Sequence, residues 1–262
     1  PVNVPRTLRG LAAALSLLLA AATTTARAAA IQSAASGYWN VGATWQGGVV
    51  PAAGDTVTVQ GVHTVTIPDA YAAVAGTSPA TGGTNALTGT GTVVVGESDG
   101  AANPASLRLL GPASSALNVT FRAKTILIFD ATGAASPATT NYAWSIGYQS
   151  RVIFNGTATA RCQVYSVAGG GNGYFTGSGS QTGQLQASYT DFSRIGDATN
   201  PLVLCTPGPA PGGLLFLNST ADSCGWVRTN DNGGNTVVRV EGSRFTNSAA
   251  AASVYIAGTS AL

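Results

Sequence analysis

Apolar and polar residues alternate along two short runs near the start of the chain. Val57 and Val59 alternate with threonines in the first run, and Val65 and Ile67 do so in the second. A period of two residues is typical of a β-strand with one buried face. The two runs therefore predict the first two strands of a β-structure, joined by a short turn.

The residues just before these runs predict a boundary of that structure. Gly48 and Pro51 favour turns, and Trp45 is large enough to cover the open end of a hydrophobic core. We interpret residues 36–55 as an N-terminal cap. Stacked coils are expected from about residue 56 to residue 262.

Short strand-like runs continue along the chain, and no stretch after residue 31 keeps a helical period. Gly, Pro, Ser, Asn and Asp fill the intervals between them. This arrangement predicts one all-β domain over residues 31–262. The clearest further strand candidates are 92–95, 106–110, 118–121, 125–129, 151–154 and 161–167.

A repeat in the last third of the chain predicts how these strands are arranged. Three segments align at offsets of 29 and then 24 residues, which places Phe192, Ala221 and Phe245 in one column. Periods in the twenties are typical of a solenoid, in which each coil buries its inward residues against its neighbours. The predicted interior comprises Val57, Val59, Val65, Ile67, Val93, Val95, Leu127, Phe129, Phe192, Ile195, Leu217 and Phe245.

With this repeat the chain resembles the right-handed parallel β-helices, an architecture shared by pectate lyases, polygalacturonases and phage tailspikes. Residues 45–67 are similar to the entry of the eight-glycine domain of extracellular β-helical proteins, some of which act on or bind polysaccharides. The resemblance implies a single-stranded right-handed parallel β-helix with an N-terminal cap. No catalytic motif of the two enzyme families can be matched residue by residue.

Composition also favours stacked β-structure. Only 8% of the 262 residues are charged, against roughly 25% in an average globular protein, and there are 34 glycines. A sandwich of two antiparallel sheets joined by hairpins is the alternative architecture.

The chain has no Met, and a strand-like run at 254–256 lies close to its last residue. We therefore expect a fragment of a longer protein that lacks its C-terminal end.

Residues 1–30 predict a secretory signal peptide. Arg6 and Arg9 precede an apolar run at 11–22, and 26–28 have the small-x-small pattern of a cleavage site. A membrane anchor is the alternative, but the run is shorter than the ~20 residues that span a bilayer. Cleavage would leave 12 − 3 = 9 basic and 10 acidic residues. A secreted or cell-surface protein with this balance is not expected to bind nucleic acid or membranes.

Few residues offer catalytic chemistry. His63 is the only histidine, and neither a nucleophile nor a carboxylate can be assigned to it. Cys162, Cys205 and Cys224 are an odd number with no metal-binding spacing, so we expect small, buried side chains. No metal site and no cofactor are predicted from the residues.

Asp191 and Asp222 are the candidate catalytic residues. They lie on adjacent repeats, so stacked coils would bring them within the several Å that paired carboxylates need for glycoside hydrolysis. A lyase would instead use a base or a metal, and Ca²⁺ is the cofactor expected in that case. The simpler interpretation is that both side chains solvate an outward face.

Three function classes remain open. The first is a non-catalytic extracellular module that binds a polysaccharide or cell-surface glycan, as part of a longer chain with further domains. The second is a polysaccharide lyase or glycoside hydrolase, and the third is an ice-binding solenoid with outward threonines. Sugar binding favours exposed aromatic rings, although these side chains could equally pack in the core. The candidate ligand-binding residues are Tyr174, Trp226, Tyr142 and Trp144.

Overall fold

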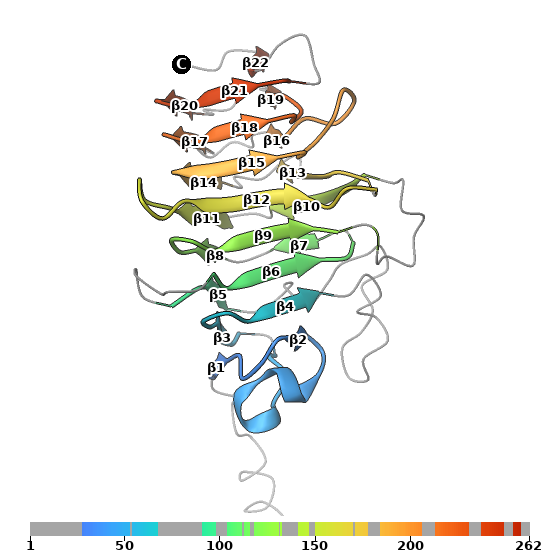
Figure 1. Cartoon of the computed structure of the whole chain (residues 1–262), viewed down its shortest axis with the longest axis vertical. Helices are drawn as coiled ribbons and strands as arrows, with labels where there is room; N and C mark the ends of the chain where they lie inside the picture. The colour runs from blue at the N-terminus through green and yellow to red at the C-terminus, as the bar shows by residue number, and fades with distance from the viewer. Residues whose placement is uncertain are drawn as a thin grey trace, which may run out of the picture.

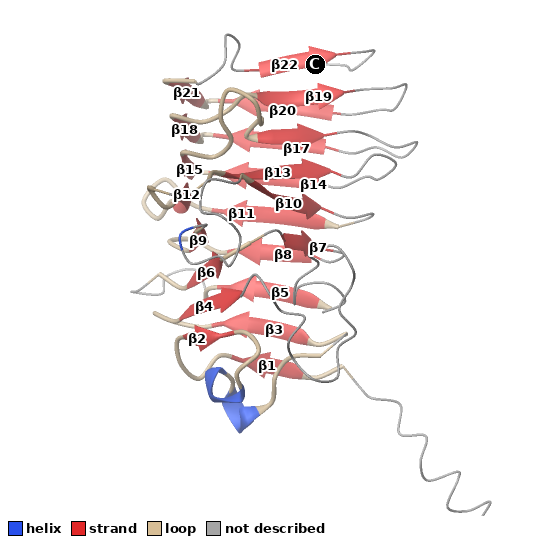
Figure 2. Cartoon of the chain, turned by 90° about the vertical axis from the view of Figure 1, so that its right-hand side faces the viewer, coloured by secondary structure: helices blue, strands red, loops and turns tan. Residues whose placement is uncertain are grey.

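The protein is an all-β solenoid built from three long parallel sheets (Figures 1 and 2). The computed structural model describes residues 28–52, 54–67, 91–97, 104–111, 113–115, 118–130, 132, 141–146, 150–169, 171–177, 184–205, 213–230, 237–248 and 254–257. The predicted signal peptide therefore lies outside the described residues, except for its last positions.

Each sheet collects one strand from successive coils. The first sheet has the order β1 (Ala30–Gln32), β3 (Thr56–Val59), β5 (Thr92–Val95), β8 (Asn118–Phe121), β11 (Arg151–Asn155), β14 (Gln184–Ser188), β17 (Gly213–Leu217) and β20 (Val237–Glu241). The second sheet has the order β2 (Gly37–Tyr38), β4 (Thr64–Ile67), β6 (Ser106–Leu109), β9 (Ile126–Phe129), β12 (Cys162–Ser166), β15 (Thr190–Ser193), β18 (Thr220–Asp222) and β21 (Arg244–Thr246). The third sheet has the order β22 (Val254–Ala257), β19 (Val227–Asn230), β16 (Val203–Cys205), β13 (Gly173–Gly177), β10 (Tyr142–Ile146) and β7 (Ala113–Ser115).

The chain runs from the first sheet to the second and then, in the later coils, to the third before it starts the next coil. Neighbouring strands in all three sheets pair in parallel, as in β11 with β14 and β12 with β15. The front strands of Figure 1 point to the right while the chain climbs from β1 to β22, so the coil is right-handed. This is a parallel β-helix, and the hairpin-joined sandwich is excluded because consecutive strands lie in different sheets.

The repeat columns in the sequence match the observed register. Phe192 pairs with Ala221, and Ala221 pairs with Phe245 on the next coil. Phe192 and Ala221 are buried, and Phe245 is half-buried against the same core. The prediction that these residues stack on successive parallel strands is confirmed.

The core is a set of side-chain stacks that run along the solenoid. In the first sheet, register places one inward aliphatic residue from every coil in a single stack, and all eight are buried. A second stack adds aromatic rings, with Phe121 and Phe154 4.6 Å apart and nearly parallel. Such ladders bury each residue against its equivalents above and below. The aliphatic stack is Ile31, Val57, Val93, Val119, Val152, Leu185, Leu214 and Val238.

Leu217 is the exception among the predicted interior residues. In β17 the buried side chains are Leu214 and Phe216, and Leu217 is half-buried on the outward side. The run Leu-Leu-Phe-Leu is apolar throughout, so alternation cannot reveal which positions face inward. The register with β14 pairs Leu214 with Leu185, and this pairing determines which side chains of β17 face inward.

The N-terminal end is closed by two tryptophans and two short 3₁₀ helices, η1 (Gly42–Thr44) and η2 (Gln46–Gly48). Trp45 and Trp39 are buried with their ring centroids 4.9 Å apart, and Trp45 Nε1 donates to the Trp39 carbonyl at 2.7 Å. The burial of Trp45 at this end agrees with a cap. The coils themselves start earlier than residue 56, because β1 and β2 already belong to the first and second sheets.

Candidate ligand-binding site

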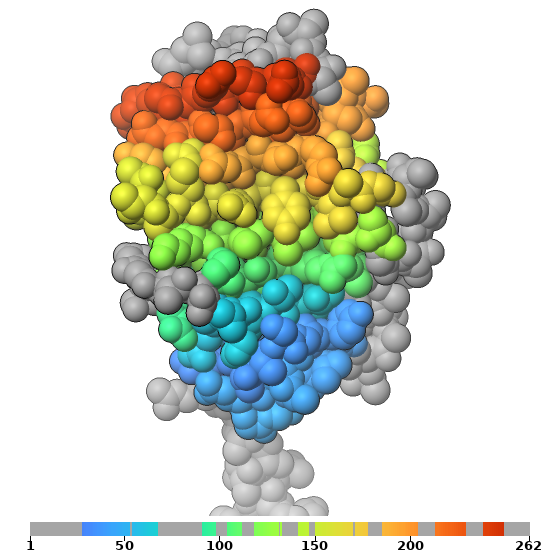
Figure 3. Space-filling view, in the orientation of Figure 1, coloured from blue at the N-terminus to red at the C-terminus, as the bar shows by residue number. Residues whose placement is uncertain are grey.

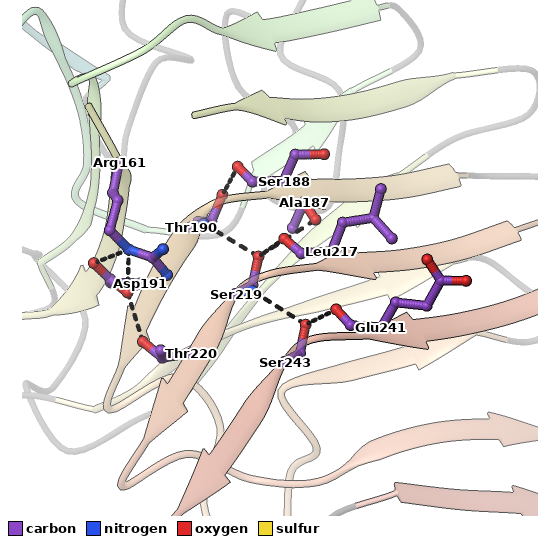
Figure 4. A network of polar contacts seen from close by, with 10 residues as sticks. All are labelled: Arg161, Ala187, Ser188, Thr190, Asp191, Leu217, Ser219, Thr220, Glu241 and Ser243. Atoms are coloured by element: carbon purple, nitrogen blue, oxygen red, sulfur yellow. Dashed lines mark hydrogen bonds and ion pairs between the residues drawn. The ribbon is translucent and has the colours of Figure 1, made fainter. Parts of the chain in front are cut away.

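In the later coils, the corner between the first and second sheets contains a column of hydroxyl groups (Figure 4). Ser219 Oγ accepts a hydrogen bond from the Thr190 backbone N–H at 3.1 Å, and Ser243 Oγ accepts one from the Ser219 N–H at 3.1 Å. Strand register places Cys162 and Thr125 in the same column on the preceding coils. The column satisfies backbone groups that a tight corner would otherwise leave unpaired.

The corner between β11 and β12 is longer than the corners of the coils that follow it, from β14 onward. Between β11 and β12 the chain makes a short hairpin over residues 156–161, in which Thr157 and Ala160 exchange backbone hydrogen bonds of 3.0 and 3.2 Å. Gly156 starts it, and a Cβ there would lie 2.2 Å from the Tyr189 carbonyl oxygen. The hairpin projects at the left edge of the solenoid in Figure 1, where β11 connects to β12.

The hairpin forms one wall of a pocket of about 460 Å³ against the outer face of the second sheet. Insertions that break a solenoid repeat often mark a binding face. In Figure 3 the coils cross this face as successive bands of colour. The pocket is lined by Pro104, Lys124, Ile126, Ala158, Thr159, Ala160, Arg161, Gln163 and Asp191.

An ion pair between Arg161 and Asp191 lies in the pocket wall. Arg161 Nε donates to both carboxylate oxygens at 2.9 and 2.8 Å, and its Nη2 lies 2.7 Å from Oδ1. Thr220, on the next coil, donates its hydroxyl to Asp191 Oδ1 at 2.6 Å. The two charged side chains are 29% and 40% exposed, so both border solvent.

These contacts keep Asp191 ionised. Partial burial alone would raise the pKa of Asp191, but hydrogen bonds from Arg161 and Thr220, with the charge of Arg161, hold it below its usual value. Asp191 is therefore a hydrogen-bond acceptor at neutral pH. A general acid of a glycosidase needs the opposite, a carboxyl whose pKa is raised.

Asp222, the second catalytic candidate, lies on the same outer face but outside the pocket. Asp191 pairs with Thr220 and Asp222 with Ser193, so the two aspartates are two residues apart on adjacent strands. From strand geometry their Cα atoms are about 8 Å apart. Asp222 accepts hydrogen bonds from Thr246 and Asn247, which lower its pKa, and it is exposed. The spacing suits a carboxylate pair, but neither group is a proton donor at neutral pH.

The outer face next to the pocket also carries an aromatic ring. Gln163 and Tyr165 alternate with buried Cys162 and Val164, and Tyr165 is half-buried on the outward side. Tyr165 lies between Ile128 and Ser193 of the neighbouring strands. Its ring is therefore placed on the same face as the pocket, two residues along the strand from Gln163.

Two of the four predicted aromatic ligand-binding residues are corrected to core residues. Trp144 is fully buried against Phe121 and Phe175, and Tyr142 is 6% exposed with its hydroxyl bonded to the Leu109 carbonyl at 2.9 Å. Neither ring offers a face to a ligand. Both alternate with outward residues in β10, and the coil register turns them inward.

Tyr174 and Trp226 remain candidate binding residues. Both are half-buried. Register in the third sheet aligns Tyr174 with Leu202 and Leu202 with Trp226, so the two rings belong to one column, two coils apart. Leu202 between them is fully buried. Their role in binding stays a prediction.

His63 takes part in a structural contact. Its Nδ1 lies 2.8 Å from Ser33 Oγ, which also accepts a hydrogen bond from the Gln60 backbone N–H at 2.8 Å. Ser33 is fully buried, so a substrate cannot reach its hydroxyl. The pair joins the first two coils and is not a nucleophile with its base.

The two cysteines whose side chains are described are free thiols in the core. Cys162 and Cys224 are buried, and burial raises the pKa of each to about 11. A thiol that stays protonated is a poor nucleophile. The predicted apolar role is confirmed for these two, whereas the Cys205 side chain lies outside the described residues.

Within the described part of the chain, no group of three or more His, Cys, Asp or Glu is placed to hold a metal ion. No helix there is long and apolar enough to cross a bilayer. The outward threonine columns of the first sheet are short, because Thr56 and Thr92 are followed by Asn118, and Thr58 is followed by Val94. The array that an ice-binding surface would need ends after two coils.

Among the residues that line the pocket, Asp191 was the one that the sequence pointed to as a candidate functional residue. Gln163 and Tyr165 could have been found from the alternation in 161–167, which places both outward. Arg161 could not, because its pairing with Asp191 depends on the register of two coils and on the hairpin between them. Lys124 stands out only as the single lysine.

The fold and the pocket together define a parallel β-helix with a hairpin that borders a pocket on one face. Models of known protein families, curated proteins and solved structures were each compared with the chain, and none of them matches. The resemblance to pectate lyases and to the eight-glycine domain therefore remains a likeness in pattern.

Proposed function

We propose that this β-helix is an extracellular module that binds carbohydrate on the outer face of its second sheet, and that it positions its ligand rather than cleaving it. The observation that carries the proposal is the pocket beside the 156–161 hairpin. Its walls present hydrogen-bonding groups of the kind that sugar hydroxyls recognise, held by a rigid stack of strands.

The charged acceptor of the pocket, the Asp191 carboxylate, is already oriented by the fold. Asp191 is fixed by Arg161 and Thr220, so its carboxylate accepts hydrogen bonds in one direction. Gln163 and Thr159 are exposed at the pocket wall and supply an amide and a hydroxyl. Preorganised groups cost little entropy when a ligand binds.

Tyr165 supplies the apolar component. A half-buried tyrosine between Ile128 and Ser193 has its ring supported by the sheet while part of it faces solvent. Such a ring offers a rigid surface for the apolar face of a sugar, and its hydroxyl can bond at the edge. Pocket and ring lie on one face of the coil, as a chain of several sugar units would require.

We favour binding over catalysis because the carboxyl groups on this face are not proton donors at neutral pH. Both Asp191 and Asp222 have a lowered pKa, and their oxygens accept hydrogen bonds from neighbouring side chains. The described residues near them include no histidine, since His63 bonds to Ser33 in the first coils at the N-terminal end of the solenoid. Hydrolysis or elimination needs a group whose pKa is matched to proton transfer.

The test uses the chain from Ala29 onward, which keeps β1 and the contact of the Ala29 N–H with Asp55 at 2.8 Å. Retention on immobilised neutral and acidic polysaccharides is measured, together with new reducing ends and the ultraviolet absorbance of unsaturated sugars. We expect retention without turnover. Tyr165→Ala should weaken it by about tenfold, or 1.4 kcal/mol.

Tyr38→Ala is the matched control, because Tyr38 is 50% exposed in the cap, away from the pocket. It should leave retention unchanged, and Tyr174→Ala and Trp226→Ala test the third sheet in the same assay. Turnover that disappears in Asp191→Asn would replace the binding proposal with the enzyme alternative. Failure to bind any polysaccharide would remove the proposal.

A further inference from the structure

We infer that the hairpin pocket selects a glycan that bears an anionic group, a carboxylate or a sulfate, bound at Lys124. This inference rests on the proposed carbohydrate binding and adds the charge of the ligand and its orientation in the pocket.

The lining of the pocket contains one more positively charged than negatively charged side chain. Lys124, Arg161 and Asp191 are the charged residues in its lining. Arg161 and Asp191 neutralise each other in an ion pair, whereas Lys124 is exposed and takes part in none of the ion pairs of the described residues. An anion that enters the pocket therefore meets an unneutralised ammonium group.

Lys124 is held at the pocket by its backbone. Its N–H donates to the Ala160 carbonyl at 3.3 Å, which ties the turn before β9 to the hairpin. Its φ of 65° is left-handed, a conformation that favours glycine. Tyr189 and Asn218 are left-handed at the corresponding corners of later coils, and glycine takes this conformation at Gly96 and Gly242. The left-handed φ of Lys124 is therefore a property of this type of corner, and the hydrogen bond to Ala160 is what places Lys124 beside the hairpin.

Asp191 determines how an anionic glycan is oriented in the pocket. Its ionised carboxylate repels an anion placed beside it and accepts hydrogen bonds from neutral hydroxyls. The anionic group of the ligand is therefore expected at the Lys124 side of the pocket, with sugar hydroxyls toward Asp191 and Gln163. A neutral glycan can occupy the hydroxyl positions but gains nothing from Lys124.

The experiment compares polymers that share a backbone and differ in charge. Retention is measured on carboxymethylcellulose against hydroxyethylcellulose, and on polygalacturonate against its methyl ester, at low and high NaCl. We expect an acidic polymer to be retained more strongly than its neutral partner. The difference should shrink at high salt, because exposed charges are screened.

Three variants locate the effect. Lys124→Gln should lower retention of the acidic polymer about threefold to tenfold and leave the neutral one unchanged. Lys124→Arg, which keeps the charge, should retain most of the binding. Arg151→Gln is the control, because it removes one positive charge from an exposed position at the start of β11 on the first sheet.

The outcomes separate this inference from the proposal beneath it. Equal retention of both members of each pair, unaffected by Lys124→Gln, would overturn the anionic ligand and leave carbohydrate binding in place. An equal loss in Arg151→Gln would show general charge attraction and would also overturn the site. If no polymer is retained, both the inference and the proposed function fail.

Discussion

Two corners of the same solenoid differ in how the chain turns from the first sheet to the second. Between β14 and β15 a single residue, Tyr189, makes the turn, and Thr190 at its exit bonds to the hydroxyl column. Between β11 and β12 the turn occupies residues 156–161 and projects over the sheet. The strands on either side keep the same register in both coils.

From this difference we expect stability and the proposed ligand binding to depend on different parts of a coil. The tight corner repeats because its hydroxyl groups satisfy buried backbone donors, and any change there is felt by the neighbouring coils. The long corner adds residues outside the stack, where they shape a pocket without disturbing the pairing. Variants of the two corners should therefore affect unfolding and ligand binding to different extents.

The largest effect is expected where the core lies beneath the long corner. Phe154 is fully buried against Phe121, Phe175 and Phe192. Phe154→Ala should lower the free energy of unfolding by about 3–5 kcal/mol, because the cavity cannot collapse between stacked coils. Denaturant unfolding followed by far-ultraviolet circular dichroism measures it. A loss below that of Ser219→Ala would contradict the stacked-core account.

The tight corner should give the next largest effect. Ser219→Ala removes the acceptor of the Thr190 N–H in a site that is 2% exposed, and should cost about 1–3 kcal/mol. Ser219→Cys is the control, because Cys162 already occupies an equivalent position in the column. It should be milder than the alanine variant in the same unfolding experiment. Equal stability of the alanine variant and the parent would show that the hydroxyl column is dispensable.

Shortening the long corner should affect binding far more than stability. Deletion of residues 157–161 leaves Gly156 as a one-residue turn like Tyr189, and removes the pocket wall together with Arg161. The free energy of unfolding should change by no more than about 1 kcal/mol, since loop length has a weak effect on stability. Retention on the polysaccharide bound by the parent should disappear. Unfolded protein, or unchanged retention, would contradict the separation of roles.

The smallest effect is expected on the decline of folding stability at acidic pH. The folded pKa of Asp191 is lowered, so its contribution is present above the unfolded pKa of about 3.9 and is lost as the pH falls through the folded value. Asp191→Asn should lower stability at neutral pH by about 0.2–1 kcal/mol, because the pair is partly exposed. It should also flatten the decline below about pH 4. Thermal unfolding from pH 2 to pH 7 tests both expectations, and an unchanged acid slope would refute them.

Much of the architecture could be predicted from local patterns. Val57, Val59, Val65 and Ile67 are inward because strict alternation fixes which face is buried, whatever the neighbouring coil contains. The column of Phe192, Ala221 and Phe245 could be read because repeats of one solenoid carry equivalent residues at equivalent positions. These features depend on residues that are close in sequence, or on the comparison of equivalent positions in successive repeats.

The arrangement of residues at the candidate ligand-binding site depends on the tertiary structure. The sequence by itself determined the strand periodicity, the repeat and the place of Trp45 at the N-terminal end, because each follows from residues within one segment or from equivalent positions in successive repeats. Only the fold decided that Trp144 is buried, that Leu217 faces outward and that Arg161 meets Asp191. Those outcomes depend on the register between coils and on the length of each corner, which bring together residues about 30 positions apart.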